Sequence, residues 1–227
     1  MKHIFIHIGK TAGTSFRTFL ESNVSKPYWG YNKLWFLTDD RDIQKFLELE
    51  PNGMAILEHC DLFSEHMSYG LHPYLKTKDY QYIAMFRDPV SRTISAYRYA
   101  IDRGWITEDK PVIDWFNEDT SQKHYQIHHI AGVPHDLPYE TKLQIALKNL
   151  NDKRLLFGFT EKYDEFIDLC CEINGWRPQY KTTNVTKAKK EVSEEDKESL
   201  KVLLSDEIEF YDKAVLIYNE KYKKVTT

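Results

Sequence analysis

MKHIFIHIGKTAGTS, residues 1–15, decides the fold of this chain. Its apolar run from Ile4 to Ile8 predicts a buried strand. The run breaks at Gly9, and apolar residues then recur at helical spacing from about Thr14 onward. A strand that passes through a short turn into a helix offers an anion its backbone N–H groups and the positive end of the helix dipole. The segment therefore predicts an anion-binding loop after the first strand.

The triplet Gly9-Lys10-Thr11 also matches the end of the nucleoside-triphosphate P-loop. The complete P-loop has another glycine five residues before its Gly-Lys pair, and that position is Ile4 here, inside the strand. The loop is therefore too short to wrap a β- or γ-phosphate in the usual way. A plain strand–turn–helix unit with an idle lysine is the alternative interpretation.

A second motif lies in residues 82–99, YIAMFRDPVSRTISAYRY. The run from Tyr82 to Phe86 does not alternate with polar residues, which is typical of a buried strand in a parallel sheet. Arg87 would stand at the carboxyl end of this strand, and Ser95 would lie two turns along the following helix. A guanidinium can hold a terminal phosphate through two parallel hydrogen bonds, and a serine hydroxyl can add a third. The alternative interpretation is that Arg87 and Arg92 are solvated or form salt bridges at the start of the helix and bind no phosphate.

The two motifs resemble those of sulfotransferases that use 3′-phosphoadenosine 5′-phosphosulfate (PAPS). The first resembles the 5′-phosphosulfate loop, usually written PKTAGTS, with Gly9 in place of the proline. The second resembles the 3′-phosphate motif, RDPVxRxxSxY. Residues 155–166 and 184–190 resemble the late strand–helix and the C-terminal cofactor loop of the same family. The family is the carbohydrate type, which includes the heparan sulfate 2-O-sulfotransferases and many bacterial relatives.

The resemblance implies transfer of a sulfuryl group from PAPS to a hydroxyl acceptor, with 3′-phosphoadenosine 5′-phosphate (PAP) as product and no metal. The acceptor would be a sugar or glycan, while a lipid glycan, a small metabolite and a peptide tyrosine stay open. Lys10 would be catalytic, because its charge can neutralise the oxygen that leaves the sulfur. The residues that the resemblance assigns to the cofactor are Lys10, Thr11, Ala12, Gly13, Thr14, Ser15, Arg87, Ser95, Lys187, Lys189 and Lys190.

The general base is the second catalytic residue that the resemblance implies. In residues 56–72, His66 takes the place of the family's catalytic histidine, and an imidazole suits proton removal near neutral pH. The animal 2-O enzymes have a second histidine two residues earlier, where this chain has Ser64. The alternatives for the base are His72, Glu58, Asp61 and Glu65.

Other histidines allow a weaker hypothesis. His124, His128 and His129 lie in a helical-looking segment, where a spacing of four residues could bind zinc. No carboxylate or cysteine completes the set, so the wall of a polar acceptor cleft is the alternative. His3 and His7 flank the first strand and are interpreted as structural.

Composition limits the classes of protein. The chain has 227 residues, 41% of them hydrophobic, enough for one α/β domain over residues 1–227. The net charge of −4 does not support nucleic-acid binding. No apolar run of 18 residues indicates a membrane span, and no leader precedes the first strand, so we expect a cytoplasmic protein. Three cysteines give no disulfide framework. The oligomeric state stays open.

The order of elements predicts an α/β fold, a P-loop-like three-layer sandwich with a central parallel sheet flanked by helices. Strands are expected at 3–8, 54–58, 81–86 and 154–159. Helices are expected at 14–23, 40–49, 90–103, 110–118, 121–131, 138–150, 161–174, 193–203 and 205–223. Ligands of such sheets bind beyond the carboxyl ends of the strands. The two loops and the region just after Glu58 are expected there.

Two rival functions remain at this point. A nucleotide or small-molecule kinase would use Gly9-Lys10-Thr11 as a P-loop, with Asp88 as its best candidate for holding magnesium. A non-catalytic nucleotide-binding protein of the same fold would bind the nucleotide and transfer nothing. The presence of both Lys10 and His66 favours an enzyme.

Overall fold

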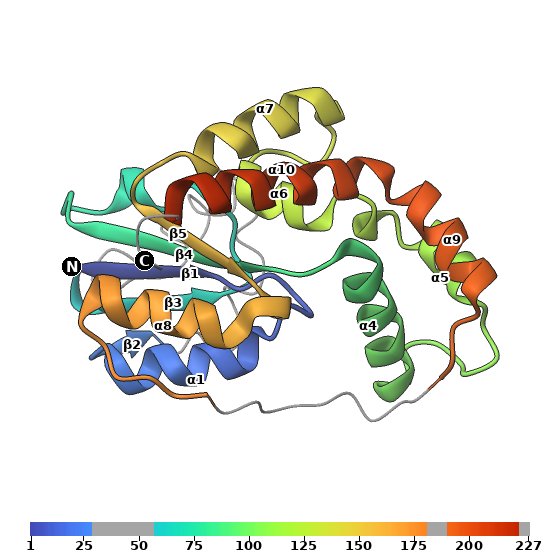
Figure 1. Ribbon diagram of the computed structural model, residues 1–227, viewed down its shortest axis with the longest axis horizontal. Helices are drawn as coiled ribbons and strands as arrows, with labels where there is room; N and C mark the ends of the chain where they lie inside the picture. The colour runs from blue at the N-terminus through green and yellow to red at the C-terminus, as the bar shows by residue number, and fades with distance from the viewer. Residues whose placement is uncertain (29–56, 181–189, 223–227) are drawn as a thin grey trace.

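A parallel sheet with helices on both faces forms the centre of the protein (Figure 1). The computed structural model describes residues 1–28, 57–180 and 190–222. The strands pair in the order β2-β3-β1-β4-β5, and every pair is parallel. The strands are β1 (Lys2–Ile6), β2 (Pro27–Tyr28), β3 (Leu62–Glu65), β4 (Tyr80–Phe86) and β5 (Leu155–Phe159). The expected α/β fold is confirmed.

The helices form a layer on each face of the sheet and a group beyond its carboxyl end. In Figure 1, α1 and α8 lie on one face, and α6, α7 and α10 lie on the other. Helices α4, α5 and α9 lie past the ends of the strands and share a separate apolar cluster. The helices are α1 (Gly13–Asn23), α4 (Pro89–Asp102), α5 (Val112–Glu118), α6 (Tyr125–Ala131), α7 (Tyr139–Leu150), α8 (Tyr163–Asn174), α9 (Glu194–Leu203) and α10 (Ser205–Tyr222). The short 3₁₀ turns are η1 (His72–Tyr74), η2 (Thr120–Gln122) and η3 (Thr160–Lys162).

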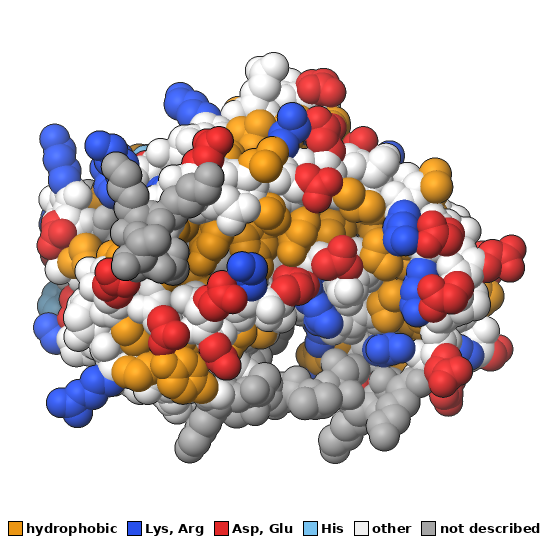
Figure 2. All heavy atoms as spheres, viewed as in Figure 1, with side chains coloured by type: hydrophobic (Ala, Val, Ile, Leu, Met, Phe, Trp, Pro, Cys, Tyr) orange, Lys and Arg blue, Asp and Glu red, His pale blue; other side chains and the backbone are white. Residues whose placement is uncertain are grey.

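The inner strands form because their side chains can be buried on both faces. All five residues of the inner strand β1 are buried, and so are all five of β5, the edge strand beside β4, because helices cover both faces of the sheet. Phe16 of α1 packs on Phe5 from one face, while Phe210 of α10 packs on Phe86 from the other. Apolar side chains also form a band on the surface between α8 and α10 (Figure 2). Leu216 on α10 is 63% exposed.

The expected strand at 54–58 is wrong for the residues that the structure describes. Residues 57–59 are helical, and the strand that pairs with β1 begins only at Leu62. A short apolar run does not distinguish a strand from a buried helical turn, and Leu57 enters the core from such a turn. The expected helix at 40–49 lies outside the described residues. The expected helix at 121–131 is divided into η2 and α6.

No helix in the described ranges is long and apolar enough to cross a membrane. Cys60, Cys170 and Cys171 are free thiols in the structure.

Candidate functional site

The carboxyl end of the sheet brings the two predicted loops together. Ile6, the last residue of β1, is in register with Glu65 of β3 and with Ala84 of β4. Since all strands run in the same direction, the segments after β1, β3, β4 and β5 emerge at the same end. Lys10, Arg87 and His66 all belong to these segments.

The loop between β1 and α1 has an unusual backbone. Lys10 and Ala12 both adopt left-handed conformations, with φ of 69° and 59°. Each such residue other than glycine costs about 1 kcal/mol or more, and this kind of strain is concentrated at functional sites. The buried hydroxyl of Thr11 donates to the carbonyl of Ile8 at 2.9 Å and closes the turn. Ala12 is the N-cap of α1, and its methyl group accepts no hydrogen bond from the first turn. The loop therefore presents a helix N-terminus that carries no side-chain cap.

Lys10 and Arg87 meet in this loop although they are far apart in sequence. The Nη1 atom of Arg87 donates to the carbonyl of Lys10 at 3.2 Å. The Lys10 ammonium lies over the ring of Tyr99, 4.1 Å from its centroid. Burial lowers the pKa of Lys10, and the positive charge of Arg87 lowers it further. Two neighbouring cations in a partly buried site favour an anion between them.

The second loop, Arg87 and Asp88 between β4 and α4, is held in place by its neighbours. Burial lowers the pKa of Arg87, while Glu161 and Asp88 oppose that shift. The Asp88 carboxylate accepts from the Ser91 backbone N–H at 2.8 Å and caps α4. This capping role is the ordinary one for an aspartate before Pro89, and it engages the carboxylate that the kinase hypothesis needs for magnesium.

The remaining residues of the predicted 3′-phosphate group are only partly described. Ser95 is half-buried on α4. The Nε atom of Arg98, on the same helix, donates to the carbonyl of Lys190 at 2.9 Å, so Lys190 returns to this helix. Lys187 and Lys189 lie outside the described residues. Arg92, the other arginine of the motif, is buried and donates to Gln122 at 2.8 Å, so its role is internal packing.

His66 follows β3 directly and packs on the loop after β1. Its Nδ1 atom lies 2.7 Å from the carbonyl oxygen of His7, and the two rings stack with centroids 4.3 Å apart. Because a carbonyl only accepts, Nδ1 carries the proton and Nε2 carries the lone pair. Burial lowers the pKa of His66, Arg17 adds to this, and the hydrogen bond to His7 opposes it. Burial thus favours the neutral form of the His66 ring.

His7 also touches the loop that His66 faces. A Cβ atom on Gly13 would come within 2.1 Å of the His7 ring, so glycine is required where the ring crosses the start of α1. Burial lowers the pKa of His7 well below its usual value, and His66 lowers it further. The sequence analysis interprets His7 as structural and does not predict its contacts with His66 and with Gly13 at the start of α1. Its position at the end of β1 was the available signal.

The alternative bases with described side chains lie at the opposite, amino end of the sheet. His72 contacts Tyr82, and its ring stacks on Tyr80, the first residue of β4. The Glu58 carboxylate pairs with Lys76, and Asp61 accepts from Ser25 at 3.0 Å.

The backbone confirms the position of the two carboxylates. The Lys2 ammonium donates to the Glu58 carbonyl at 2.9 Å, and the backbone N–H of His3 donates to the Asp61 carbonyl at 2.8 Å. Both contacts are made at the start of β1. The expectation that the region just after Glu58 lies at the carboxyl end was wrong, because it rested on the misplaced strand.

The histidines of the helical-looking segment do not converge on one point. His124 pairs with Asp206 at 2.9 Å, and the ring of His128 stacks on His135. His129 Nδ1 lies 2.7 Å from the Tyr125 carbonyl, and burial lowers its pKa to about 4. Within the described residues, no group of three or more histidine, cysteine or acidic side chains could hold a metal ion.

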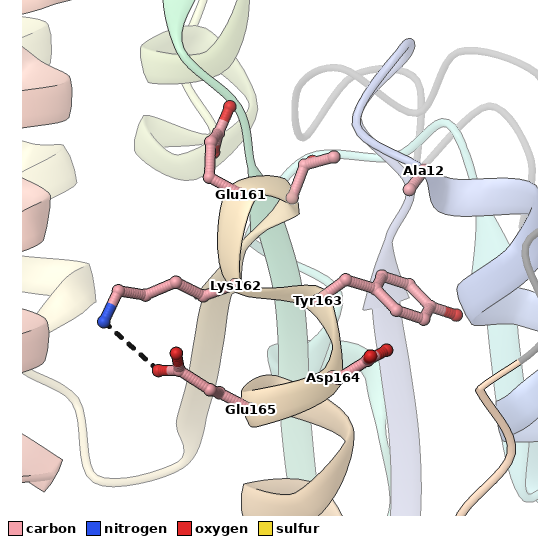
Figure 3. Close-up of a pocket in the computed structure, with 7 residues that line it drawn as sticks. Ala12, Glu161, Lys162, Tyr163, Asp164 and Glu165 are labelled. Atoms are coloured by element: carbon pink, nitrogen blue, oxygen red, sulfur yellow. Dashed lines mark hydrogen bonds and ion pairs between the residues drawn. The ribbon is translucent and has the colours of Figure 1, made fainter.

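A cavity of about 340 Å³ adjoins the loop after β1 (Figure 3). Ala12 forms one side, and the residues from Thr160 to Glu165 form the other. In Figure 3 the Tyr163 side chain extends below Ala12, on the same side of the view. Glu161, Asp164 and Glu165 line the cavity with Lys162, which pairs with Glu165 at 3.1 Å. The lining therefore carries more negative than positive charge, which disfavours a phosphate there.

No protein-family model matches this chain, and no curated protein matches it either. Among solved structures, the crystal structure of a sulfotransferase from Alicyclobacillus acidocaldarius is similar to it, with a TM-score of 0.54. The match covers 96% of each chain at 14% sequence identity. At this identity the likeness establishes the fold, and it does so over nearly the full length.

Proposed function

We propose that this protein is a sulfotransferase that moves the sulfuryl group of PAPS to a hydroxyl of a sugar or glycan. The observation that carries the proposal is the hydrogen bond between Arg87 and the carbonyl of Lys10, which joins the two predicted cofactor loops in one site. The structural likeness to a bacterial sulfotransferase supports it independently of these residues.

The loop after β1 would bind the 5′-phosphosulfate. The N–H groups of Gly13, Thr14 and Ser15 form the start of α1, whose first turn holds no acidic side chain. A helix N-terminus of this kind attracts phosphate and sulfate oxygens. Lys10 would neutralise the bridging oxygen as its bond to sulfur breaks, and removing a preorganised donor of this kind costs ~3 kcal/mol of barrier.

Arg87 would hold the 3′-phosphate, which distinguishes PAPS from ATP. Its guanidinium is oriented by the Lys10 carbonyl and makes no ion pair with any described residue, so its remaining donors can meet an anion. Ser95 would add a hydroxyl. Lys190, whose carbonyl accepts from Arg98 of α4, would add its charge, and Lys187 and Lys189 remain predicted from the sequence. The cavity beside Ala12 would take an uncharged part of the nucleotide.

His66 would be the general base. Its Nε2 atom would take the proton of the acceptor hydroxyl while the acceptor oxygen bonds to sulfur. The sulfur–oxygen bond to the 5′-phosphate would break, and its electron pair would stay on the PAP oxygen beside Lys10. Sulfuryl transfer to an alcohol balances with these groups alone. General-base catalysis of this kind is worth ~10²–10⁴-fold in rate.

A transfer assay with radiolabelled PAPS tests the proposal. The acceptors would be oligosaccharides, glycolipids, phenols and tyrosine peptides, and the readouts would be PAP release and labelled product. We expect transfer without added magnesium, with a saccharide as the best class of acceptor. Magnesium-dependent phosphoryl transfer from ATP would instead show a kinase. Tight PAP binding with no transfer to any acceptor would favour a non-catalytic protein.

A further inference from the structure

Helix α6 contacts both loops of the proposed site from the face opposite to α1. Tyr125, its first residue, reaches Gly9, and Gln126 reaches Arg87. We infer that these two residues position the two halves of the nucleotide site, Gln126 for the 3′-phosphate and Tyr125 for the 5′ end. The inference rests on the proposed function, because it assigns the two ends of PAP to these loops.

Gln126 makes a two-point contact with the backbone of Arg87. The Arg87 N–H donates to Gln126 Oε1 at 2.9 Å, and Gln126 Nε2 donates to the Arg87 carbonyl at 2.9 Å. A primary amide is the side chain that offers one acceptor and one donor side by side. Gln126 is fully buried, and its own backbone N–H is held by Glu207 of α10. The contact therefore fixes the point at which the Arg87 side chain leaves the sheet.

Tyr125 fills the space where residue 9 would carry a side chain. A Cβ atom at Gly9 would lie 2.9 Å from the Tyr125 hydroxyl oxygen, but 3.5 Å from the ring carbon that bears it. The buried Arg92 guanidinium lies over the same ring, 4.5 Å from its centroid, and holds the tyrosine in place. Any residue with a Cβ atom at position 9, proline included, would therefore meet the tyrosine hydroxyl.

The two contacts predict different losses of binding. A change at Gln126 moves Arg87, so it should weaken the binding of PAP and leave the binding of ADP nearly unchanged. ADP carries two phosphates as PAP does, but both are at its 5′ position. A change at the contact of Gly9 with Tyr125 moves the 5′ loop, so it should weaken both nucleotides together. A merely structural role for α6 would not change the preference for PAP over ADP.

The first test is titration calorimetry of Gln126→Met with PAP and with ADP. Methionine keeps the volume and removes both hydrogen bonds. We expect the Kd for PAP to rise about tenfold or more, and the Kd for ADP to change less than about threefold. Asn149→Leu is the matched control, because Asn149 holds the other end of α6 through the Ile130 carbonyl and touches neither loop. A Gln126→Met protein that keeps the wild-type preference would overturn the role of Gln126.

The second test is a double-mutant cycle between Gly9→Ala and Tyr125→Phe. Gly9→Ala alone should raise the Kd of PAP and ADP alike by about tenfold. In the Tyr125→Phe background the same alanine meets the ring at ordinary contact distance, so binding should return to within about threefold of wild type. An alanine that is equally harmful in both backgrounds would refute the contact.

Urea unfolding of the same proteins without nucleotide separates this inference from the proposed function. A wild type that binds neither nucleotide would refute the proposed function. The stability cycle would then still show whether Gly9 and Tyr125 are coupled. A wild type that prefers PAP, combined with variants that keep that preference and show no coupling, would refute the inference about α6 and leave the proposed function intact.

Discussion

Two cations at the carboxyl end of the sheet, Lys10 and Arg87, differ from two at the amino end, Lys76 and Arg154, in what holds them. At the carboxyl end, Lys10 and Arg87 make no ion pair with any described residue, and Arg87 is held by a backbone carbonyl. At the amino end, Lys76 pairs with Glu58, and Arg154 pairs with Asp152 at 3.3 Å. Glu161 and Asp88 attract Arg87, and Asp102 attracts Lys10, but none of them forms an ion pair with these cations, so both can still meet an anionic ligand. Exposed ion pairs such as those at the amino end contribute little stability. The proposed site at the carboxyl end rests on this contrast together with the contact between the two loops.

The largest expected effect is the difference in kcat between variants of His66, at the carboxyl end of the sheet, and His72, at the amino end. His66→Ala should lower kcat by ~10²–10⁴-fold, because it removes the proposed base, and it should leave the Kd for PAP nearly unchanged. His72→Ala should change kcat per folded molecule less than about twofold, since His72 packs on Tyr80 and Tyr82. Steady-state kinetics with saturating acceptor would measure both. The opposite ranking would assign the base to the amino end.

Lys10→Ala should have the next largest effect. We expect kcat to fall by ~10²–10³-fold with a smaller loss of nucleotide affinity, because the ammonium acts mainly as the sulfur–oxygen bond breaks. Lys76→Ala, which removes an exposed lysine at the amino end, is the control and should be silent. A Lys10→Ala protein that loses nucleotide binding while its kcat at saturation is unchanged would make Lys10 a binding residue only.

Arg87→Ala compares binding at the two ends. Loss of a charge-assisted phosphate contact should raise the Kd for PAP by ~10–100-fold, as measured by calorimetry. The Kd for ADP should change much less. Arg154→Ala at the amino end should leave both affinities as they are. Unchanged PAP binding after Arg87→Ala would remove Arg87 from the site.

The smallest expected effect is on the pH profile. Burial lowers the pKa of His66 below the ordinary histidine value of 6.5, and a base works only when neutral. The kcat of the wild type should therefore rise with pH, reach half its maximum below pH 6.5 and stay level above neutrality. A limb centred above pH 7 would show that another group titrates, or that the ring is not buried when PAPS is bound.

The sequence predicts the local parts of this site and misses the parts that depend on distant contacts. The loop after β1 and the Arg87 segment could be recognised, because each joins a continuous apolar run to a short motif. Strand β3 could not be placed, since the run at 54–58 was the stronger signal and LFSE is short and partly polar. The error put Glu58 at the wrong end and left His66 supported only by the resemblance.

Tyr125 and Gln126 show the limit more clearly. Their partners, Gly9 and Arg87, are 116 and 39 positions away, so no spacing or periodicity links them. The replacement of the motif's proline by Gly9 was visible in the sequence. The contact that a side chain at position 9 would make with the Tyr125 hydroxyl is visible only in the fold, where α6 packs against the loop.

The measurement that tests the central claim most directly is the affinity of the wild-type protein for PAP and for ADP, by titration calorimetry at one ionic strength. The two nucleotides both carry two phosphates, but the two monoesters of PAP bear about one more negative charge than the diphosphate of ADP. A general attraction for anions would therefore give only a small preference for PAP. If the carboxyl end of the sheet holds one phosphate at the Lys10 loop and another at Arg87, PAP should bind at least about tenfold more tightly than ADP. Equal affinities, or tighter binding of ADP, would contradict the account.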